Sequence, residues 1–186
     1  EITTRLVGSE MCIRDRIGLS RPSDVRPRPV CLENVVAHVM RLIRQDAEQR
    51  NVSLEYRTSR RVPNVLVDSE RMGQALLNLC LNALDAMPDG GRMTLVIAKA
   101  KRRVCLMVRD TGKGTDPAAM AHIFDPYFTT KGQGTGLGLA MVHKIVAAHN
   151  GEISVYSRLA GEDGHGETIF RLWLPLAPVS YTHLRA

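Results

Sequence analysis

The sequence predicts an α+β fold, a two-layer α/β sandwich in which three helices cover one face of a mixed, mostly antiparallel sheet. Three long segments repeat apolar residues at three- and four-residue steps, which is typical of helices packed on a core. Between them lie pairs of short segments rich in β-branched and long apolar residues, as in strands. The predicted order is helix, two strands, helix, two strands, a loop region, helix and two strands.

The first predicted helix spans about residues 31–49 and follows a proline-rich stretch. The three prolines of SRPSDVRPRPV disfavour regular structure, because proline fixes φ and pushes the preceding residue out of the helical region. Residues 17–30 are therefore expected to form a linker. Two short segments after the helix, 52–58 and 64–68, have the composition of strands.

The second predicted helix begins after Asp68, a residue type that caps helix N-termini, and ends at the sequence PDGG. Two strands that form a hairpin follow at 92–100 and 102–110. A loop-rich region leads to the third long helix, over about 136–149, which the dipeptide Asn-Gly terminates. The remaining predicted elements are a short helix at 117–123 and closing strands at 152–158 and 168–175.

The 186 residues carry a formal net charge of +6, which is compatible with a polyanionic partner. Aromatic residues make up only 4% of the chain, so platforms for stacking bases are few. The basic cluster KAKRR at 99–103 is interpreted as a solvated hairpin edge, and we expect no nucleic-acid binding. The four cysteines lack zinc-ligand spacing and mostly lie in apolar contexts, which favours buried reduced thiols.

No uninterrupted apolar run approaches the ~20 residues that a membrane-spanning helix needs. We expect no membrane contact by this fragment and a cytoplasmic location, although the parent protein could be membrane-anchored. The ends, 1–16 and 179–186, lack the periodicity of their neighbours and resemble translated sequencing-adapter sequence. They are expected to be a non-native leader and tail around a folded domain at 31–178.

Three polar residues interrupt the apolar surface of the second helix. Asn78, Asn82 and Asp85 lie at i, i+4 and i+7, and therefore on one stripe. Amide and carboxylate oxygens suit a hydrated divalent cation such as magnesium. A solvent-facing stripe without a ligand explains the same pattern, so the stripe alone is not diagnostic.

A second constellation follows the strand at 102–110. Asp110 ends this strand and precedes Gly112 and Gly114. A buried carboxylate at this place can accept a hydrogen bond from an exocyclic amine, and the glycines would let a flat ring approach the backbone. An ordinary Asp-Thr-Gly turn is the alternative interpretation.

A third constellation is the stretch FTTKGQGTGLGLAMVHKIVAAHNG at 128–151, which places alternating glycines before the third helix. A helix N-terminus presents unpaired N–H groups and a partial positive charge, and glycines let this backbone close around phosphate oxygens. Lys131 adds a mobile positive charge. The stretch matches neither a P-loop nor a dinucleotide-binding fingerprint, because G-x-x-x-x-G-K-[ST] and a preceding strand are both lacking.

Together these segments resemble the ATP-binding domain of sensor histidine kinases, the Bergerat fold shared with type II topoisomerases, mismatch-repair ATPases and the heat-shock chaperone. The resemblance covers about residues 29–175 and rests on LLNLCLNALDAM, DTGKG, IFDPYFTTKGQGTGLGLAMVHKIVAAHNG and FRLWLP, in this order. The phrase FDPYFTTK is similar to the nitrogen-regulation-like branch of these kinases. The resemblance implies that residues 31–178 are the catalytic domain of a two-component signalling kinase, a transferase that uses ATP and Mg²⁺.

By position, the resemblance implies that Asn82 binds Mg²⁺, that Asn78 supports the phosphate end of ATP and that Lys131 contacts the γ-phosphate. Asp110 would hold adenine. Asn78 and Lys131 are the implied catalytic residues, and the implied nucleotide-binding residues are Asn78, Asn82, Asp85, Asp110, Gly112, Gly114, Lys131, Gly134, Thr135, Gly136, Leu137, Gly138 and Thr168.

The identity of Asn78 bears on the reaction. ATP-hydrolysing relatives have a glutamate general base at this position, whereas an amide cannot take a proton from water. This difference favours phosphoryl transfer to a protein side chain over hydrolysis. An ATP-hydrolysing enzyme, and a non-catalytic module that binds nucleotide or protein, remain the alternatives. The implied partners are a histidine-containing dimerisation domain, missing from this chain, and indirectly a response regulator.

The sequence departs from the family's pattern in two places. In GHGETIF, Glu167 stands between Gly166 and Thr168 where G-x-G-T is usual, which leaves the place of Thr168 at the back of the base pocket open. None of the six histidines has the acidic neighbour and helical context of a phosphoacceptor. His143 and His149 are expected to be structural.

Overall fold

The computed structural model describes residues 25–59, 61–130, 134–161 and 166–178, and the predicted two-layer α/β sandwich is confirmed. Five strands form one sheet in the order β2-β4-β5-β7-β6. β2 and β4 run parallel and the other neighbours run antiparallel, so the sheet is mixed and mostly antiparallel. The strands are β2 (Val52–Thr58), β4 (Gly91–Ala100), β5 (Arg103–Asp110), β6 (Glu152–Arg158) and β7 (Glu167–Pro175).

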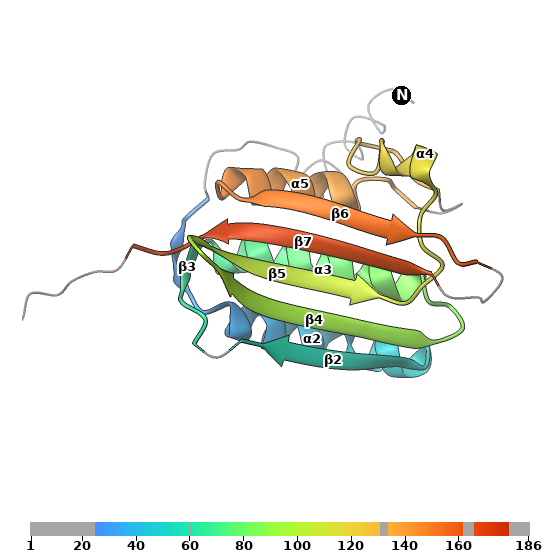
Figure 1. The fold of residues 1–186 in the computed structure, drawn as a ribbon, viewed down its shortest axis with the longest axis horizontal. Coiled ribbons are helices and arrows are strands. Elements are labelled where there is room, and N and C mark those ends of the chain that lie inside the picture. Colours follow the sequence, from blue (N-terminus) through green and yellow to red (C-terminus); the bar gives the residue numbers. More distant parts are fainter. Residues whose placement is uncertain (1–24, 60, 131–133, 162–165, 179–186) are drawn as a thin grey trace, which may run out of the picture.

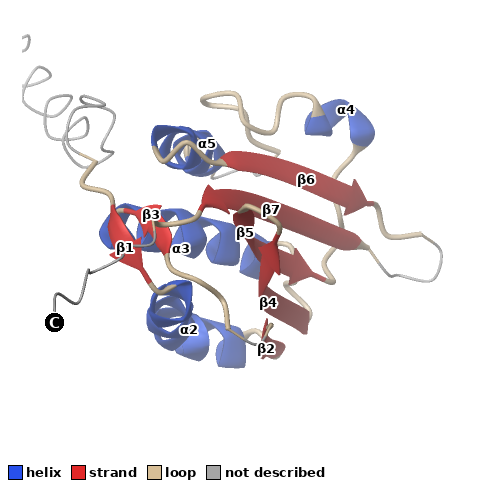
Figure 2. Ribbon diagram, turned by 60° about the vertical axis from the view of Figure 1, so that its left-hand side comes forward, coloured by secondary structure: helices blue, strands red, loops and turns tan. Residues whose placement is uncertain are grey.

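Three long helices lie behind this sheet, and no helix of the described residues covers its other face (Figure 1). They are α2 (Leu32–Gln49), α3 (Ser69–Asp85) and α5 (Gly138–Ala148). α3 lies between α2 and α5, and the view in Figure 2 shows all three on the same side of the strands. One continuous core joins the apolar faces of these helices to the inward-facing residues of the strands.

The central helix, α3, begins where the sequence predicts, because Asp68 caps it. The Asp68 side chain accepts hydrogen bonds from the backbone N–H groups of Glu70, at 3.0 Å, and Arg71, at 3.2 Å. From there an apolar stripe faces the sheet, and its buried residues are Met72, Ala75, Leu76, Leu79, Cys80, Ala83 and Leu84. α3 is therefore the element on which both other helices and the sheet converge.

The structure differs from the sequence-based expectation at the start of the domain. Residues 28–30, assigned above to a linker, form the strand β1 (Arg28–Val30), which pairs antiparallel with β3 (Val65–Val67). A two-stranded sheet apart from the main one tolerates Pro29, because an edge strand can lack one N–H donor. The strand predicted at 64–68 therefore exists, but it lies outside the five-stranded sheet.

The short helix α4 (Pro117–Met120) is shorter than the predicted 117–123. The Asp116 side chain caps its N-terminus by accepting from Ala118 N at 2.7 Å, and turns follow from residue 121.

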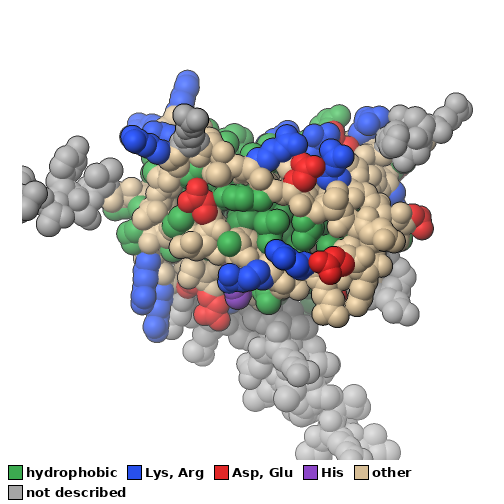
Figure 3. Space-filling view, turned by 90° about the horizontal axis from the view of Figure 1, so that it is seen from below, with side chains coloured by type: hydrophobic (Ala, Val, Ile, Leu, Met, Phe, Trp, Pro, Cys, Tyr) green, Lys and Arg blue, Asp and Glu red, His purple; other side chains and the backbone are tan. Residues whose placement is uncertain are grey.

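At the β2 edge of the sheet, hydrophobic side chains gather in the middle of a surface rimmed by charged ones (Figure 3). Leu42 of α2 and Tyr56 of β2 are among the exposed large hydrophobic residues of the molecule.

Cys80 and Cys105 are buried and free, and Cys31 is half-buried and free, whereas Cys12 lies outside the described residues. Burial raises the pKa of Cys80 to about 12, so its thiol stays protonated at neutral pH. Among the helices of the described residues, none is both long and apolar enough to span a bilayer.

Candidate functional site

A cavity of about 280 Å³ lies between α3, the loop before α5 and the start of α5. It brings together two segments that are far apart in the sequence, the polar stripe of α3 and the glycine-rich stretch before α5. Its lining residues are Asn82, Asp85, Thr115, Ile123, Phe128, Thr129, Thr130, Gly134, Thr135, Gly136, Gly138 and Leu139. Six of them, Asn82, Asp85, Gly134, Thr135, Gly136 and Gly138, are residues that the sequence singled out.

The polar stripe of α3 supplies one wall of the cavity. Asn82 and Asp85 line it, and Asp85 forms an ion pair of 2.9 Å with Arg50 at the end of α2. Asn78 lies one turn earlier and does not line the cavity, and its side-chain amide points to the sulfur of Met141 at 3.8 Å. The Asn78 amide is therefore directed toward α5 at Met141.

The start of α5 supplies the opposite wall. Its N-cap residue, Leu137, has no side chain that can cap the first turn, so no side-chain acceptor of its own takes up the first N–H groups. A Cβ built at Gly138 would meet nothing nearer than the Asn82 side-chain nitrogen, at 4.0 Å. The helix N-terminus therefore faces Asn82 of the α3 stripe, and its unpaired N–H groups suit an anion.

The loop before α5 closes on itself through Gly136. Tyr127 N donates to the Gly136 carbonyl at 3.0 Å, and a Cβ at Gly136 would lie only 2.4 Å from the Tyr127 carbonyl carbon. Gly136 also has a φ of +67°, a conformation that side chains other than glycine's rarely adopt. Lys131, the predicted contact of the γ-phosphate, lies outside the described residues.

Asp110 ends β5 beyond this cavity and is only 2% exposed. One carboxylate oxygen, Oδ1, accepts from Gly112 N at 3.0 Å. Burial raises the pKa of Asp110 to about 6, the Gly112 N–H opposes this shift and the charge of Glu167 adds to it. A buried acceptor with a shifted pKa is typical of functional sites rather than of plain turns.

The two glycines after Asp110 serve a purpose that the sequence did not predict. A Cβ at Gly112 would lie 2.5 Å from the Ala86 carbonyl oxygen, and one at Gly114 would lie 2.1 Å from the Arg158 carbonyl oxygen. Gly114 also has a φ of +73°. Both glycines therefore allow the chain's own backbone segments to pack closely around Asp110, and neither lines the cavity.

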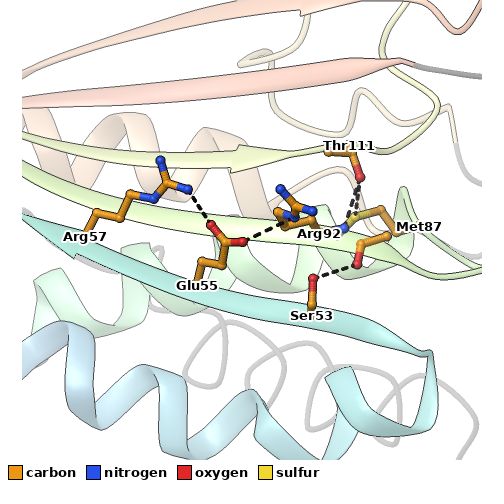
Figure 4. A network of polar contacts seen from close by, with 7 residues as sticks. Ser53, Glu55, Arg57, Met87, Arg92 and Thr111 are labelled. Carbon is orange, nitrogen blue, oxygen red and sulfur yellow. Dashed lines mark hydrogen bonds and ion pairs between the residues drawn. The ribbon is translucent and has the colours of Figure 1, made fainter.

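Polar contacts also anchor the end of β5 (Figure 4). The Thr111 hydroxyl accepts from Arg92 N at 3.0 Å and lies 3.9 Å from the sulfur of Met87, which follows α3. Next to these contacts, the Glu55 carboxylate of β2 forms ion pairs with Arg57, at 2.9 Å, and with Arg92 of β4, at 3.3 Å. These contacts tie the residue after Asp110 to the start of β4 and to the turn after α3.

Thr168 lies beside Asp110 in the sheet. The two residues are Cα partners on the antiparallel strands β7 and β5, and Thr168 is 6% exposed. Side chains of such partners share one face of the sheet. Glu167, the extra residue of the third glycine motif, points to the other face and forms an ion pair with Arg109. The insertion therefore leaves Thr168 in register with Asp110.

Ser157 belongs to the same site, although no sequence motif indicates it. It is the Cα partner of Thr168 on β6, and its hydroxyl lies 3.0 Å from the Thr168 hydroxyl. It also accepts from Thr115 N at 2.8 Å and contacts the Glu167 carbonyl at 2.9 Å. Thr115, which lines the cavity, was likewise missed, because a lone threonine in a loop carries no pattern.

His149 is structural, as the sequence indicates. It is 2% exposed, its Nδ1 lies 2.7 Å from the Ile145 carbonyl, and its Nε2 accepts from Asp68 N at 2.9 Å. Nδ1 must carry the proton, because a carbonyl only accepts. His143 is exposed, and its ring lies tilted against Phe124 at a centroid distance of 5.6 Å. His149 therefore joins the end of α5 to the cap of α3.

The described residues contain no group of three or more His, Cys, Asp or Glu side chains that could hold a metal ion. A divalent cation at this cavity would therefore combine the Asn82 amide oxygen and the Asp85 carboxylate with oxygens of a ligand and water, a set that suits Mg²⁺. The helix N-terminus opposite would take the ligand's negative groups. The residues present thus fit a phosphate ligand that carries a magnesium ion.

Comparison with known proteins agrees with this geometry. Residues 67–178 match the family model described as histidine kinase-, DNA gyrase B- and HSP90-like ATPase. The chain is 38% identical over 164 residues to the sensor histidine kinase ZraS of Escherichia coli, covering 88% of this chain and 34% of that protein. It is also 32% identical to the histidine-protein kinase AtoS of Escherichia coli, over 89% of this chain and 27% of that protein.

Solved structures give the same result. The catalytic domain of the histidine kinase ThkA superposes with a TM-score of 0.72 at 28% identity, over 81% of this chain and 95% of that domain. Full-length ShkA in complex with AMPPNP superposes with a TM-score of 0.74 at 31% identity, over 88% of this chain and 34% of ShkA. The chain spans about a quarter to a third of the length of the curated relatives named above. It belongs to the family of histidine kinase-, DNA gyrase B- and HSP90-like ATPases, and it corresponds to the ATPase domain of sensor histidine kinases.

Proposed function

We propose that this chain is the ATP-binding catalytic domain of a two-component sensor histidine kinase, over about residues 31–178. It transfers the γ-phosphate of Mg·ATP to a histidine on a separate dimerisation domain. One observation carries the proposal: a glycine-rich helix N-terminus and a polar stripe line one cavity, and the buried carboxylate of Asp110 is connected to it through Thr168, Ser157 and the lining residue Thr115. The ShkA relative, crystallised with AMPPNP, supports nucleotide as the ligand.

Asp110 binds the base. At neutral pH its carboxylate is mostly ionised, because its pKa is about 6, and it accepts a hydrogen bond from the 6-amino group of adenine. Thr168 lies beside it at the back of the same pocket. Gly112 and Gly114 keep this pocket in shape, because they let the surrounding backbone pack closely.

The phosphates lie against the start of α5. The N–H groups after Leu137, together with Thr135 and the backbone of Gly134, Gly136 and Gly138, hold the phosphate oxygens. Lys131, in the same loop, contacts the γ-phosphate. When bound, Mg²⁺ supplies positive charge that neutralises the phosphates, and Asn82 and Asp85 are its protein neighbours.

Asn78 determines the choice between transfer and hydrolysis. It supports the phosphate end from one helical turn away, and as an amide it cannot remove a proton from an attacking water. Water bound at the γ-phosphate is therefore poorly activated, so hydrolysis of ATP is slow and the phosphoryl group is transferred when an acceptor histidine binds. Charge neutralisation and positioning then account for the catalysis by this domain.

The partners of the domain follow from the same proposal. The phosphoacceptor histidine belongs to a dimerisation domain outside this chain, and a response regulator receives the group afterwards. A structure of ThkA in complex with the response regulator TrrA supports such a partner for that relative. The motif FDPYFTTK supports a place in the nitrogen-regulation-like branch, and we expect the domain to act in the cytoplasm.

Calorimetric titration of Mg·ADP into the purified chain tests the proposal. We expect binding that Asp110→Ala abolishes and that Asp89→Ala, an exposed residue outside the pocket, leaves unchanged. With radiolabelled Mg·ATP we expect no stable phosphohistidine and little phosphate release from the chain alone. Sustained phosphate release would favour a hydrolase instead, and an unmutated folded chain that fails to bind Mg·ADP would refute nucleotide binding.

A further inference from the structure

Three neighbouring strands place a row of polar side chains across the inner face of the sheet. Asp110 on β5, Thr168 on β7 and Ser157 on β6 are successive Cα partners, and these strands lie side by side in Figure 1. Asp110 and Thr168 are buried, and Ser157 is half-buried. Each hydroxyl in such a row must direct its single proton to one acceptor.

The contacts of Ser157 favour one assignment of these protons. Thr115 N–H can only donate, so the Ser157 oxygen accepts from it at 2.8 Å. The Glu167 carbonyl can only accept, so the Ser157 proton points to it at 2.9 Å. The contact of 3.0 Å between the hydroxyls of Ser157 and Thr168 is then a hydrogen bond only if Thr168 donates.

This assignment changes what Thr168 can offer to a ligand. Its proton is held by Ser157, so its oxygen can present lone pairs only. The neighbouring Asp110 is also an acceptor when ionised, and its Oδ1 already takes the Gly112 N–H. Asp110 and Thr168 therefore suit a ligand group with two N–H donors. They repel a carbonyl oxygen, because the acceptor oxygens of the ligand and of these two residues would then face one another without a proton between them.

We propose that Ser157 is a specificity-determining positioning residue: by holding the Thr168 proton, it makes the site select a 6-amino purine over a 6-oxo purine. Ser157 acts through Thr168 and does not itself touch the base. The inference rests on the proposed function, because it assumes that a purine nucleotide occupies the pocket. It adds that discrimination against the 6-oxo base depends on a residue of β6, outside the family's glycine motifs.

The test compares calorimetric affinities for Mg·ADP and Mg·IDP, which differ at the 6-position of the base. Unmutated protein is expected to prefer Mg·ADP. In Ser157→Ala the Thr168 hydroxyl is released and can donate to the 6-oxo group, so the preference should fall about tenfold, the effect of one hydrogen bond. Ser157→Thr keeps the hydroxyl and should restore the preference. Ser154→Ala, on the same strand but in register with Arg171 on the opposite face, is the matched control and should leave the ratio unchanged.

A purely structural role for Ser157 predicts a different result, because loosened packing in Ser157→Ala would lower the affinities for Mg·ADP and Mg·IDP equally. An unchanged ratio in Ser157→Ala, or an equal loss of both affinities, would overturn the inference. A second comparison removes the Thr168 hydroxyl: in a Thr168→Val background, Ser157→Ala should no longer change the ratio, and a change there would also overturn it. If the unmutated chain binds neither nucleotide, the proposed function fails. If it binds Mg·ADP and Mg·IDP equally, only this inference fails.

Discussion

Replacing Asp110 by asparagine should stabilise the nucleotide-free domain while it abolishes nucleotide binding. Burial raises the pKa of Asp110 from 3.8 to about 6. Since the folded pKa lies above the unfolded one, ionised Asp110 opposes folding, and stability is lost as the pH rises through about 6. The difference between these two pKa values corresponds to about 3 kcal/mol at neutral pH, which is an upper limit for the gain. Asparagine keeps the oxygen that accepts from Gly112 N.

Urea unfolding at pH 7.5 and pH 5 would measure this effect. At pH 7.5 the free energy of unfolding of Asp110→Asn should exceed that of the unmutated chain by about 1–3 kcal/mol. At pH 5 the difference should shrink, because Asp110 is then largely protonated. Asp89→Asn, at an exposed position, serves as the control at both pH values. A variant that is no more stable at pH 7.5, or a gain that does not depend on pH, would refute the argument that buried charge at Asp110 destabilises the fold.

Three further changes test the supports of the site. Asp68→Ala removes the cap of α3 and should lower the free energy of unfolding by about 1 kcal/mol, measured by urea denaturation at pH 7, with Glu70→Ala as an exposed comparison. Gly136→Ala forces a side chain into a φ of +67° and against Tyr127, so Mg·ADP affinity should fall at least tenfold in a titration while the melting temperature changes little; unaltered affinity would contradict this placement of the loop. Leu79→Ala leaves a cavity at a fully buried position of α3 and should lower the free energy of unfolding by about 2–5 kcal/mol in the same urea assay. A decrease of less than about 1 kcal/mol would mean that α3 does not form the centre of the core.

The helices of the fold could be predicted because helical periodicity is a local signal. α2, α3 and α5 all appear within two residues of their predicted bounds. Apolar periodicity marks all three, and the Asp68 cap and the glycines of PDGG and Asn-Gly also mark ends of α3 and α5. Strand pairing was less predictable. β3 has the composition of a strand, but only the folded chain shows that it pairs with β1 and lies outside the main sheet.

In the candidate site, too, some residues could be predicted from local sequence and others could not. Asn82, Asp85 and the glycines before α5 were predicted because helical spacing and glycine motifs are visible in one stretch of sequence, and the cavity brings them together. Ser157 and Thr115 could not be predicted. Each is an ordinary polar residue in its own segment, and it acquires a role only when the fold brings another segment within hydrogen-bonding distance.

By itself the sequence determined the fold class, the three polar and glycine-rich constellations and the family to which they belong. These features depend on local spacing, which the chain carries before it folds. The tertiary structure alone decided that Thr168 stands beside Asp110 in spite of the inserted Glu167, that Asn78 turns toward Met141, and that Ser157 completes the row. Strand register decides such contacts, and register follows from how the whole sheet packs against its helices rather than from any one segment.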